Sequence, residues 1–286
     1  MNFKKTYNID QLRDYSSLFS RGEVSRWYRN DFTSLNLKIS RYDASYITQN
    51  CTYFSYLKHI YKVLAKFYPN EYVYKNEFIN KQLIKELGGS NSIIYNEFRL
   101  GKAVADIVMF NGNSKVFEIK TLLDKDSRLS NQLLQYGKLF NEVYVIAPKS
   151  KVDKYLNLDG KIGIIFYDEK SGNFSLIRHS SNNSFIDVDI LMQVLHTHEY
   201  INIVENYYGI KPAFNDFNKF DICKNLIKQI PSETLNEKFI GVMKKRKINN
   251  EFSKKEKHLN QIFLALNLSC KDKQVLLTNL SSNITH

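Results

Sequence analysis

A chain of 286 residues that is 43% hydrophobic and 24% charged has the composition of a soluble globular protein, and no apolar run approaches the ~18 residues of a membrane span. The opening residues, MNFKKTYNIDQLRDY, contain no apolar core of a signal peptide, so we expect a cytoplasmic location without membrane attachment. Cys51, Cys223 and Cys270 are widely spaced and odd in number, which argues against a zinc site and a disulfide framework.

The net charge of +12 is concentrated in the two ends of the chain. Residues 1–75 contain 12 Lys and Arg against 6 Asp and Glu, and residues 201–286 contain 14 against 8. Residues 76–200 contain 15 of each and are neutral. Two basic flanks suit a polyanion such as nucleic acid, although solubility alone explains a high pI equally well.

The first 75 residues are predicted to be helical. In YFSYLKHIYKVLAKFY, residues 53–68, apolar side chains recur at helical spacing, and Pro69 then ends the helix. A second helix is predicted in NEFINKQLIKELGG, residues 76–89, where an apolar stripe runs up to a stop at Gly88-Gly89.

From residue 92 the pattern becomes that of strands. The turn NGNS, residues 111–114, suits a tight hairpin between two of them. A later helix is expected to be capped by Asp126 or Ser127. In chain order, the predicted elements are strands at 92–101, 103–110 and 115–123, a helix at 126–140, and strands at 142–148 and 161–168.

This order predicts an α/β core with a mixed central sheet flanked by helices. From residue 186 the pattern is mostly helical again, most clearly in FIDVDILMQVLHTHEYINIVENYYG, residues 185–209. We therefore expect a basic helical region at 1–75, the core at 76–185 and a second basic helical region at 186–286. No internal repeat or long linker separates them, so we expect one packed body.

Asp106, Glu118 and Lys120 place charge inside the otherwise apolar hairpin AVADIVMFNGNSKVFEIKT, residues 103–121. Side chains alternate along a strand, so Glu118 and Lys120 share a face, and hairpin pairing puts Asp106 opposite Glu118 or Ile119. Two neighbouring carboxylates repel, and a divalent cation with hard oxygen ligands, above all Mg²⁺, resolves that repulsion. A lysine beside such a metal stabilises the charge that develops during phosphodiester hydrolysis.

A solvated surface pair of Glu118 and Lys120, worth under about 1 kcal/mol, is the alternative to this site. The residues between and before these charges are Val116, Phe117 and Ile119, whereas a solvated face normally carries polar residues there too. We therefore favour a metal-dependent site.

The arrangement of Asp106 and Glu118-Ile119-Lys120 across a hairpin resembles the active site of the PD-(D/E)xK nuclease superfamily, which includes many restriction enzymes and RecB-type exonucleases. Its core of helix, three strands, helix and strand is similar to the predicted order. More narrowly, residues 75–148 resemble a group of uncharacterised bacterial and phage proteins predicted to be such nucleases. A bare D…ExK motif is common by chance, and alanine stands before Asp106 where the pattern has proline.

The resemblance implies a role for each residue of the motif. Asp106 and Glu118 would hold Mg²⁺, for which Mn²⁺ is expected to substitute, with the Ile119 carbonyl as a third protein ligand. Lys120 would position the attacking water or stabilise the transition state.

Four further residues are weaker candidates. Gln132 and Tyr136 resemble the QxxxY motif of RecB-like members; Gln132 would contact DNA or hold Lys120, whereas a tyrosine at this spacing is more often a core residue. Glu97 is either an additional metal ligand or a partner in a simple salt bridge. Glu77 resembles an acidic residue that some members contribute, but placement near a helix N-terminus explains it equally well.

A basic run near the C-terminus is a candidate nucleic-acid contact, with a solvated charged surface as the alternative. It consists of Lys244, Lys245, Arg246 and Lys247. His196 and His198 are expected to be surface residues, because positions i and i+2 of a helix face different directions and a shared metal would need non-helical backbone.

Together these features predict a Mg²⁺-dependent nuclease, and DNA is expected as substrate only by analogy with the family. Two other classes of function remain open. One is a catalytically inactive nucleic-acid-binding module of a defence or repair complex, and the other is a protein-interaction scaffold whose charge only maintains solubility. A homo-oligomer or a partner protein is compatible with either.

Overall fold

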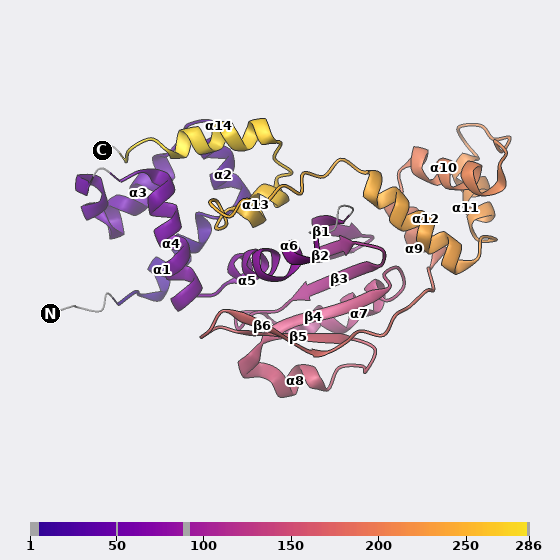
Figure 1. Cartoon of the computed structure of the whole chain (residues 1–286), viewed down its shortest axis with the longest axis horizontal. Helices are drawn as coiled ribbons and strands as arrows, with labels where there is room; N and C mark the ends of the chain where they lie inside the picture. Colours follow the sequence, from indigo (N-terminus) through magenta and orange to yellow (C-terminus); the bar gives the residue numbers. More distant parts are fainter. Residues whose placement is uncertain (1–5, 50, 88–91, 285–286) are drawn as a thin grey trace.

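Six strands form one mixed sheet whose order follows the chain from β1 to β6 (Figure 1). The structure is a computed structural model that describes residues 6–49, 51–87 and 92–284. β3, β4 and β5 are parallel to one another, whereas β1, β2 and β6 are antiparallel to their neighbours. The mixed α/β fold predicted from the sequence is therefore confirmed. The strands are β1 (Ile93–Leu100), β2 (Ala103–Phe110), β3 (Ser114–Ile119), β4 (Glu142–Pro148), β5 (Gly163–Asp168) and β6 (Asn173–Arg178).

The predicted strands differ from the observed ones mainly at their ends. β3 stops at Ile119 instead of residue 123, because Thr121 begins a turn in which the Asp124 carboxylate accepts its N–H and its hydroxyl. β6 was not predicted, since most of its side chains are exposed and it carries no apolar alternation. The predicted Gly88-Gly89 helix stop lies outside the described residues.

One face of the sheet is covered by a continuous helical segment made of α5 (Glu71–Phe78), the π-helical turn η2 (Ile79–Leu83) and α6 (Ile84–Leu87). The Phe78 ring packs against Phe117 of β3 with a centroid distance of 4.9 Å. This helix begins at Glu71 rather than at residue 76, because the Asn70 side chain caps it by accepting the N–H of Val73. The segment fixes the position of α5 beside β2 and β3.

The opposite face is covered by α7 (Leu129–Tyr136), α9 (Val188–Val194) and α12 (Ser232–Lys245), which share one apolar cluster with the sheet. The prediction that Asp126 or Ser127 caps the helix was wrong. A 3-10 turn, η3 (Asp126–Arg128), precedes α7, whose N-cap residue makes no side-chain hydrogen bond. The Asp126 carboxylate instead pairs with Lys154 of α8 (Val152–Leu156), which follows the short turn η4 (Lys149–Lys151).

The two ends of the chain pack together in a helical body beside the sheet, where the indigo and yellow helices of Figure 1 meet. Its apolar core includes Trp27, Leu57 and Phe263, all buried. The C-terminal basic region therefore contributes some of its helices to this body and others to the layer that covers the sheet. The helices of the body are α1 (Ile9–Ser17), α2 (Arg21–Tyr28), α3 (Thr33–Tyr42), η1 (Ala44–Gln49), α4 (Tyr53–Phe67), α13 (Asn260–Ala265) and α14 (Cys270–Leu280).

The helical pattern expected at residues 185–209 is confirmed and is divided into two helices, α9 and α10 (Thr197–Tyr208). Leu195 and His196 have extended backbone between them, and Glu199 accepts the N–H of His196 in a capping box that starts α10 afresh. α11 (Lys219–Ile227) then packs against α9 and α10. Among the described residues, no helix combines the length and the apolar character that a membrane crossing requires.

Candidate functional site

Asp106 and Glu118 lie opposite each other at the end of the β2–β3 pair. The ladder between the two strands runs to Ile107 paired with Phe117, and one further step brings Asp106 opposite Glu118. On the other side of β2, the strand pairs on either side of Asp106 are also the pairs on either side of Glu97 of β1, so Asp106 lies opposite Glu97. Three carboxylates from three adjacent strands thus share one level of the sheet, which we call the acidic rung.

The backbone of β1 is distorted at the acidic rung. Glu97 has a φ of 54°, in the left-handed region that non-glycine residues rarely occupy. Side chains on one face of a strand are normally two residues apart, yet Tyr95 and Phe98, which are three apart, pack in the same apolar cluster. Glu97 is therefore an extra residue in the alternation of β1. The alternation of β2 has a corresponding extra residue at Asp106. The Glu97 carboxylate lies 2.7 Å from Arg21 of α2. Distorted backbone of this kind is common at functional sites.

Both oxygens of the Asp106 carboxylate are bound within the fold. Oδ2 accepts the backbone N–H of Ile119 at 2.7 Å, and Oδ1 lies 2.9 Å from Nζ of Lys75. Lys75 projects from α5, its side chain is only 3% exposed, and its ammonium also lies 2.5 Å from Glu71. Burial acts to lower the pKa of Lys75, but the carboxylates of Asp106 and Glu71 more than offset it and hold the pKa above its usual range.

Glu118 is buried on the α7 face of the sheet, with 2% of its surface exposed. Oε1 accepts a hydrogen bond from the Lys120 ammonium at 2.7 Å, and Oε2 accepts one from the Tyr136 hydroxyl at 2.8 Å. Burial raises the pKa of Glu118, and the negative charge of Asp106 raises it further, whereas Lys120 and Tyr136 act in the opposite direction. The charge of Asp106 thus acts on the pKa of Glu118 across the β2–β3 pair, in which the two residues lie opposite each other as the hairpin pattern predicts.

Lys120 lies immediately after β3 and is held at both ends. Its backbone N–H donates to the Ile146 carbonyl of β4, and its ammonium donates to Glu118 and, at 3.4 Å, to Oε1 of Gln132. Burial acts to lower the pKa of Lys120, but the Glu118 carboxylate more than offsets it, so the pKa is raised and the side chain is a cation. Gln132 also donates to the Tyr136 hydroxyl at 3.4 Å. One helix, α7, thus orients both members of the Glu118–Lys120 pair.

Among the described residues, Glu77 and the C-terminal basic run at residues 244–247 make no hydrogen bond or ion pair with this group. The Glu77 carboxylate accepts the Tyr61 hydroxyl at 2.6 Å and pairs with Lys81 at 2.9 Å. Arg246 donates to both oxygens of Glu199, at 2.7 and 2.6 Å, so it holds α12 to α10. The other members of the run differ in exposure: Lys245 and Lys247 are exposed and Lys244 is half-buried.

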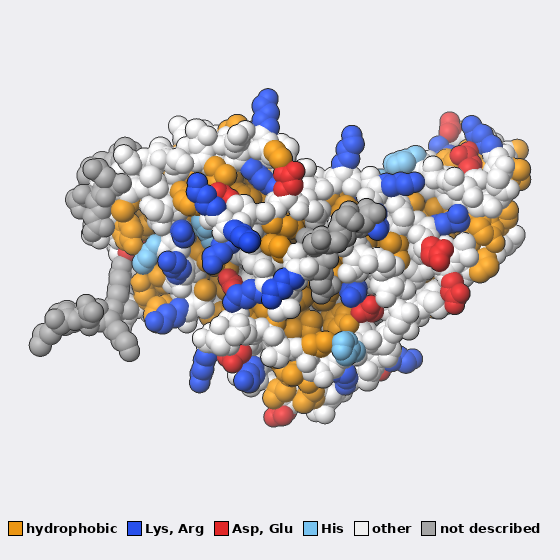
Figure 2. All heavy atoms as spheres, in the orientation of Figure 1, with side chains coloured by type: hydrophobic (Ala, Val, Ile, Leu, Met, Phe, Trp, Pro, Cys, Tyr) orange, Lys and Arg blue, Asp and Glu red, His pale blue; other side chains and the backbone are white. Residues whose placement is uncertain are grey.

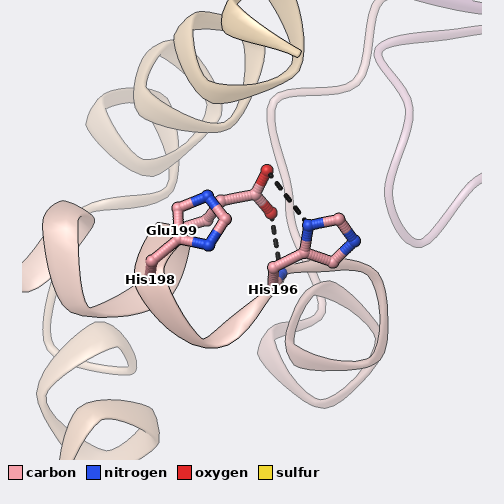
Figure 3. A group of neighbouring side chains, drawn as sticks. All are labelled: His196, His198 and Glu199. Atoms are coloured by element: carbon pink, nitrogen blue, oxygen red, sulfur yellow. Dashed lines mark hydrogen bonds and ion pairs between the residues drawn. The ribbon is translucent and has the colours of Figure 1, made fainter. Parts of the chain in front are cut away.

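A second group of metal-ligating residue types lies at the start of α10, where His196, His198 and Glu199 come together (Figure 3). Their ligand atoms all lie within 4.8 Å of one another, because His196 has the non-helical backbone that a shared site requires. Both oxygens of Glu199, however, are bound by Arg246, and one of them also accepts the His196 N–H. The guanidinium and the positive end of α10 oppose a further cation here.

Carboxylate oxygens are the ligands that hard divalent cations prefer, but in the described structure the oxygens of Glu97, Asp106 and Glu118 do not all lie within 4.8 Å of one another. Asp106 and Glu118 lie opposite each other in the register of β2 and β3, whereas Glu97 pairs with Arg21. Sequence patterns gave no signal for Lys75 or Arg21, because both reach the rung from helices distant in the chain.

The chain resembles one known family over most of its length. The model of a family described as "Bacteriophage P4 protein cII" matches residues 65–268, a range that contains all six strands and the acidic rung. A solved structure described as "SPO1766 protein of unknown function from Silicibacter pomeroyi" shows 12% sequence identity and a TM-score of 0.31, covering 48% of this chain and 94% of that chain. A TM-score of this size does not establish a shared fold. None of the curated proteins compared with the chain matches it.

Proposed function

We propose that the chain, which belongs to the bacteriophage P4 protein cII family, is a metal-dependent nuclease that hydrolyses phosphodiester bonds, with DNA as the expected substrate. The observation that carries the proposal is the Glu118–Lys120 pair beside Asp106. This group consists of the buried Glu118 carboxylate, the buried Lys120 ammonium and the Asp106 carboxylate opposite them. Burying any one of these charges without a partner would cost several kcal/mol. A buried carboxylate with a perturbed pKa and a specific charge partner is a candidate functional residue.

The residues divide into ligands and positioning groups. Asp106 and Glu118, with Glu97 as a further candidate, would hold Mg²⁺ or Mn²⁺, and the Ile119 carbonyl is the expected third protein ligand. When bound, the cation supplies Lewis-acid polarisation of a phosphoryl oxygen and lowers the pKa of a water. Lys120 supplies a fixed positive charge where negative charge develops during phosphodiester hydrolysis.

Gln132 and Tyr136 act through these residues. Gln132 restrains the Lys120 ammonium, and Tyr136 restrains one oxygen of Glu118. Hydrogen bonds of this kind orient ligands and commonly change metal affinity or activity by about 10–100-fold when removed. Basic side chains that gather over α4 to α6 on the face seen in Figure 2 suit a polyanionic substrate.

The test is cleavage of plasmid, linear and single-stranded DNA and of RNA by the full chain, with Mg²⁺, with Mn²⁺ and with EDTA. We expect metal-dependent cleavage that falls at least about 100-fold in Asp106→Asn. Asp153→Asn is the matched control, because Asp153 is an exposed carboxylate on α8 away from the rung. Equal cleavage by Asp106→Asn and the wild type would exclude this site as the catalytic centre.

The alternative function is a catalytically inactive nucleic-acid-binding module, and one contact favours it. Lys75 already pairs with Asp106 at 2.9 Å, so the carboxylate has a cationic partner within the fold. Salt-sensitive binding of nucleic acid without cleavage of any substrate in either metal would support this alternative.

A further inference from the structure

The two edges of the sheet differ in how the fold covers them. At the β1 edge, the backbone N–H of Ile94 donates to the Asn250 side chain at 2.8 Å, and α9 and α13 pack against the strand. At the opposite edge, β6 is paired with β5 alone among the described strands. An unpaired strand edge presents a row of backbone donors and acceptors, which is a template for pairing with a further strand.

β6 lacks the side chains that normally keep an open edge unpaired, which are charged residues, above all lysine, and proline. Residues 171–177, SGNFSLI, contain neither, in a chain of which 24% of the residues are charged. Arg178 follows at the end of the strand. Its guanidinium donates to the backbone carbonyls of Ile162, Leu158 and Asp159, so its charge is held against the α8–β5 connection.

The side chains of β6 also expose apolar surface. Leu176 and Ile177 are 48% and 50% exposed. Leu176 pairs with Ile165, which belongs to the apolar cluster on the α5 face of the sheet, so Leu176 lies on that face as well. Phe174, two residues earlier, packs against Phe78 of α5 with a centroid distance of 5.2 Å. The open edge therefore carries an aromatic and an aliphatic side chain side by side on one face.

A cavity of about 230 Å³ lies beside these two side chains. Phe174 and Leu176 line it together with Phe117 and Tyr144, whose rings are stacked at a centroid distance of 5.4 Å. The apolar surface of β6 thus continues inward over the sheet. A strand added at the edge, with apolar side chains on the α5 face, would cover Leu176 and extend the wall of this cavity.

The sequence of β6 is complementary to itself in an antiparallel pair. With a two-fold axis at Ser175, Phe174 of one copy lies opposite the second copy's Leu176, and Leu176 lies opposite its Phe174. Residues directly opposite each other share a face, so both apolar pairs lie on the α5 face and the two small Ser175 side chains lie on the other. The ladder ends after Leu176, because the pairing with β5 is irregular beyond it.

We propose that β6 is a dimerisation edge, through which two copies of the chain pair antiparallel at residues 174–176 and join their six-stranded sheets into one. The contact is isologous, so each apolar pair is formed twice. A second copy is the occupant that the edge fits, because the strand that complements Phe174, Ser175 and Leu176 is this strand itself. The inference involves no residue of the acidic rung and is independent of the proposed nuclease.

The first experiment measures the mass of the full chain by sedimentation equilibrium across micromolar concentrations. We expect a concentration-dependent dimer, and Leu176→Lys should raise its dissociation constant by about 10-fold or more, because a charge replaces the central apolar contact twice. Leu37→Lys is the matched control, since Leu37 of α3 is a leucine that is 64% exposed and lies outside the sheet. Circular dichroism verifies that both variants are folded.

The second experiment tests the register by disulfide cross-linking. Ser175→Cys places two thiols opposite each other at the two-fold axis, so oxidation should give a covalent dimer. Asn173→Cys is the control, because Asn173 is equally exposed but lies two residues from the axis, which separates its two copies by roughly 13 Å. Both variants carry Cys270→Ser, since Cys270 is an exposed thiol.

A wild type that stays monomeric at every concentration would overturn the inference and leave the edge to a strand of another protein. A dimer that Leu176→Lys weakens no more than Leu37→Lys does would overturn it as well, because the interface would then lie elsewhere. Equal cross-linking of the Ser175→Cys and Asn173→Cys variants would refute the two-fold register at Ser175.

Discussion

The Asp106 carboxylate accepts the backbone N–H of Ile119 at 2.7 Å, which ties the end of β2 to the end of β3 beyond their last ladder pair. A side chain thus takes the place of a strand carbonyl at the point where the two strands separate. This contact fixes Asp106 relative to Glu118 and Lys120, the neighbours of Ile119 in the chain. The position of the acidic rung is therefore set by the backbone as well as by side-chain packing.

Replacing Lys120 by methionine should abolish most cleavage while nucleic-acid binding is retained. The substitution removes the ammonium that Glu118 and Gln132 hold, and loss of one such electrostatic group typically lowers the rate by about 10²–10³-fold. Single-turnover cleavage and anisotropy, measured on the same preparation, separate the two effects. Lys115→Met, on the same strand, is the control; a similar loss in both variants would argue against a catalytic role of Lys120.

Replacing Tyr136 by phenylalanine should weaken Mn²⁺ binding about 10–100-fold and destabilise the fold by about 1–2 kcal/mol. The hydroxyl donates to Oε2 of the buried Glu118, and its removal leaves that oxygen without this partner. Isothermal titration with Mn²⁺ and urea denaturation report the two quantities. Tyr155→Phe removes a comparable hydroxyl from Asp126 and should leave Mn²⁺ affinity unchanged. Unchanged Mn²⁺ affinity in Tyr136→Phe would refute its role at the site.

The basic run at residues 244–247 should separate into residues that bind nucleic acid and one that holds the fold. Lys245→Ala and Lys247→Ala remove exposed charges, so each should reduce the salt slope of DNA binding by about 1 with stability changed by less than about 0.5 kcal/mol. Arg246→Ala should instead destabilise the protein by about 3 kcal/mol, because it leaves the buried Glu199 unpaired. Salt-dependent binding and chemical denaturation distinguish the outcomes. Full stability of Arg246→Ala would contradict the structural assignment.

His258 should make the fold sensitive to acid. Its ring is buried against Phe54 and Tyr61, and neither ring nitrogen has a hydrogen-bond partner among the described residues. Burial, with the charges of Lys58 and Lys257, lowers the pKa of His258 to about 4. Above pH ~6.5, the pKa of histidine in the unfolded chain, the ring is neutral in both the folded and the unfolded state. As the pH falls from there toward 4, the ring is protonated in the unfolded state before it is protonated in the folded state.

The free energy of unfolding should therefore decrease by up to about 3 kcal/mol through His258 between pH 6.5 and 4. Other acid-sensitive groups contribute as well, so the informative quantity is the difference between the wild type and His258→Phe. That variant should lose this part of the pH dependence and be more stable at pH 5 than the wild type. Urea denaturation at pH 7 and pH 5 measures it, and an equal pH dependence of both proteins would refute the assignment.

Much of the core and of the site could be predicted from local pattern. β2 and β4 have the predicted bounds, because apolar runs closed by turn residues define a strand with little outside help. Asp106 lies opposite Glu118 because the NGNS turn fixes the register of a hairpin. Gln132 and Tyr136 meet their partners because positions i and i+4 share a helix face.

Long-range partners decided the rest. The helical segment at residues 185–209 is divided in two where Glu199 caps a new helix, and Arg246, from distant sequence, holds the Glu199 carboxylate. The two basic ends of the chain look separate in sequence but share one apolar core. The cap itself is local, but the Arg246–Glu199 pair and the shared core leave no signal within a short window, since each depends on which surfaces meet once the chain has folded.

The sequence alone determined the mixed α/β sheet and the pairing of Asp106 with the Glu118–Lys120 strand, because alternation, turns and helical spacing are local properties of the chain. Only the tertiary structure decided that Lys75 and Arg21 neutralise the acidic rung, since both reach it from helices that are brought beside the sheet by burial of apolar surface. Charge partners are set by proximity in space, and a single sequence does not record that proximity.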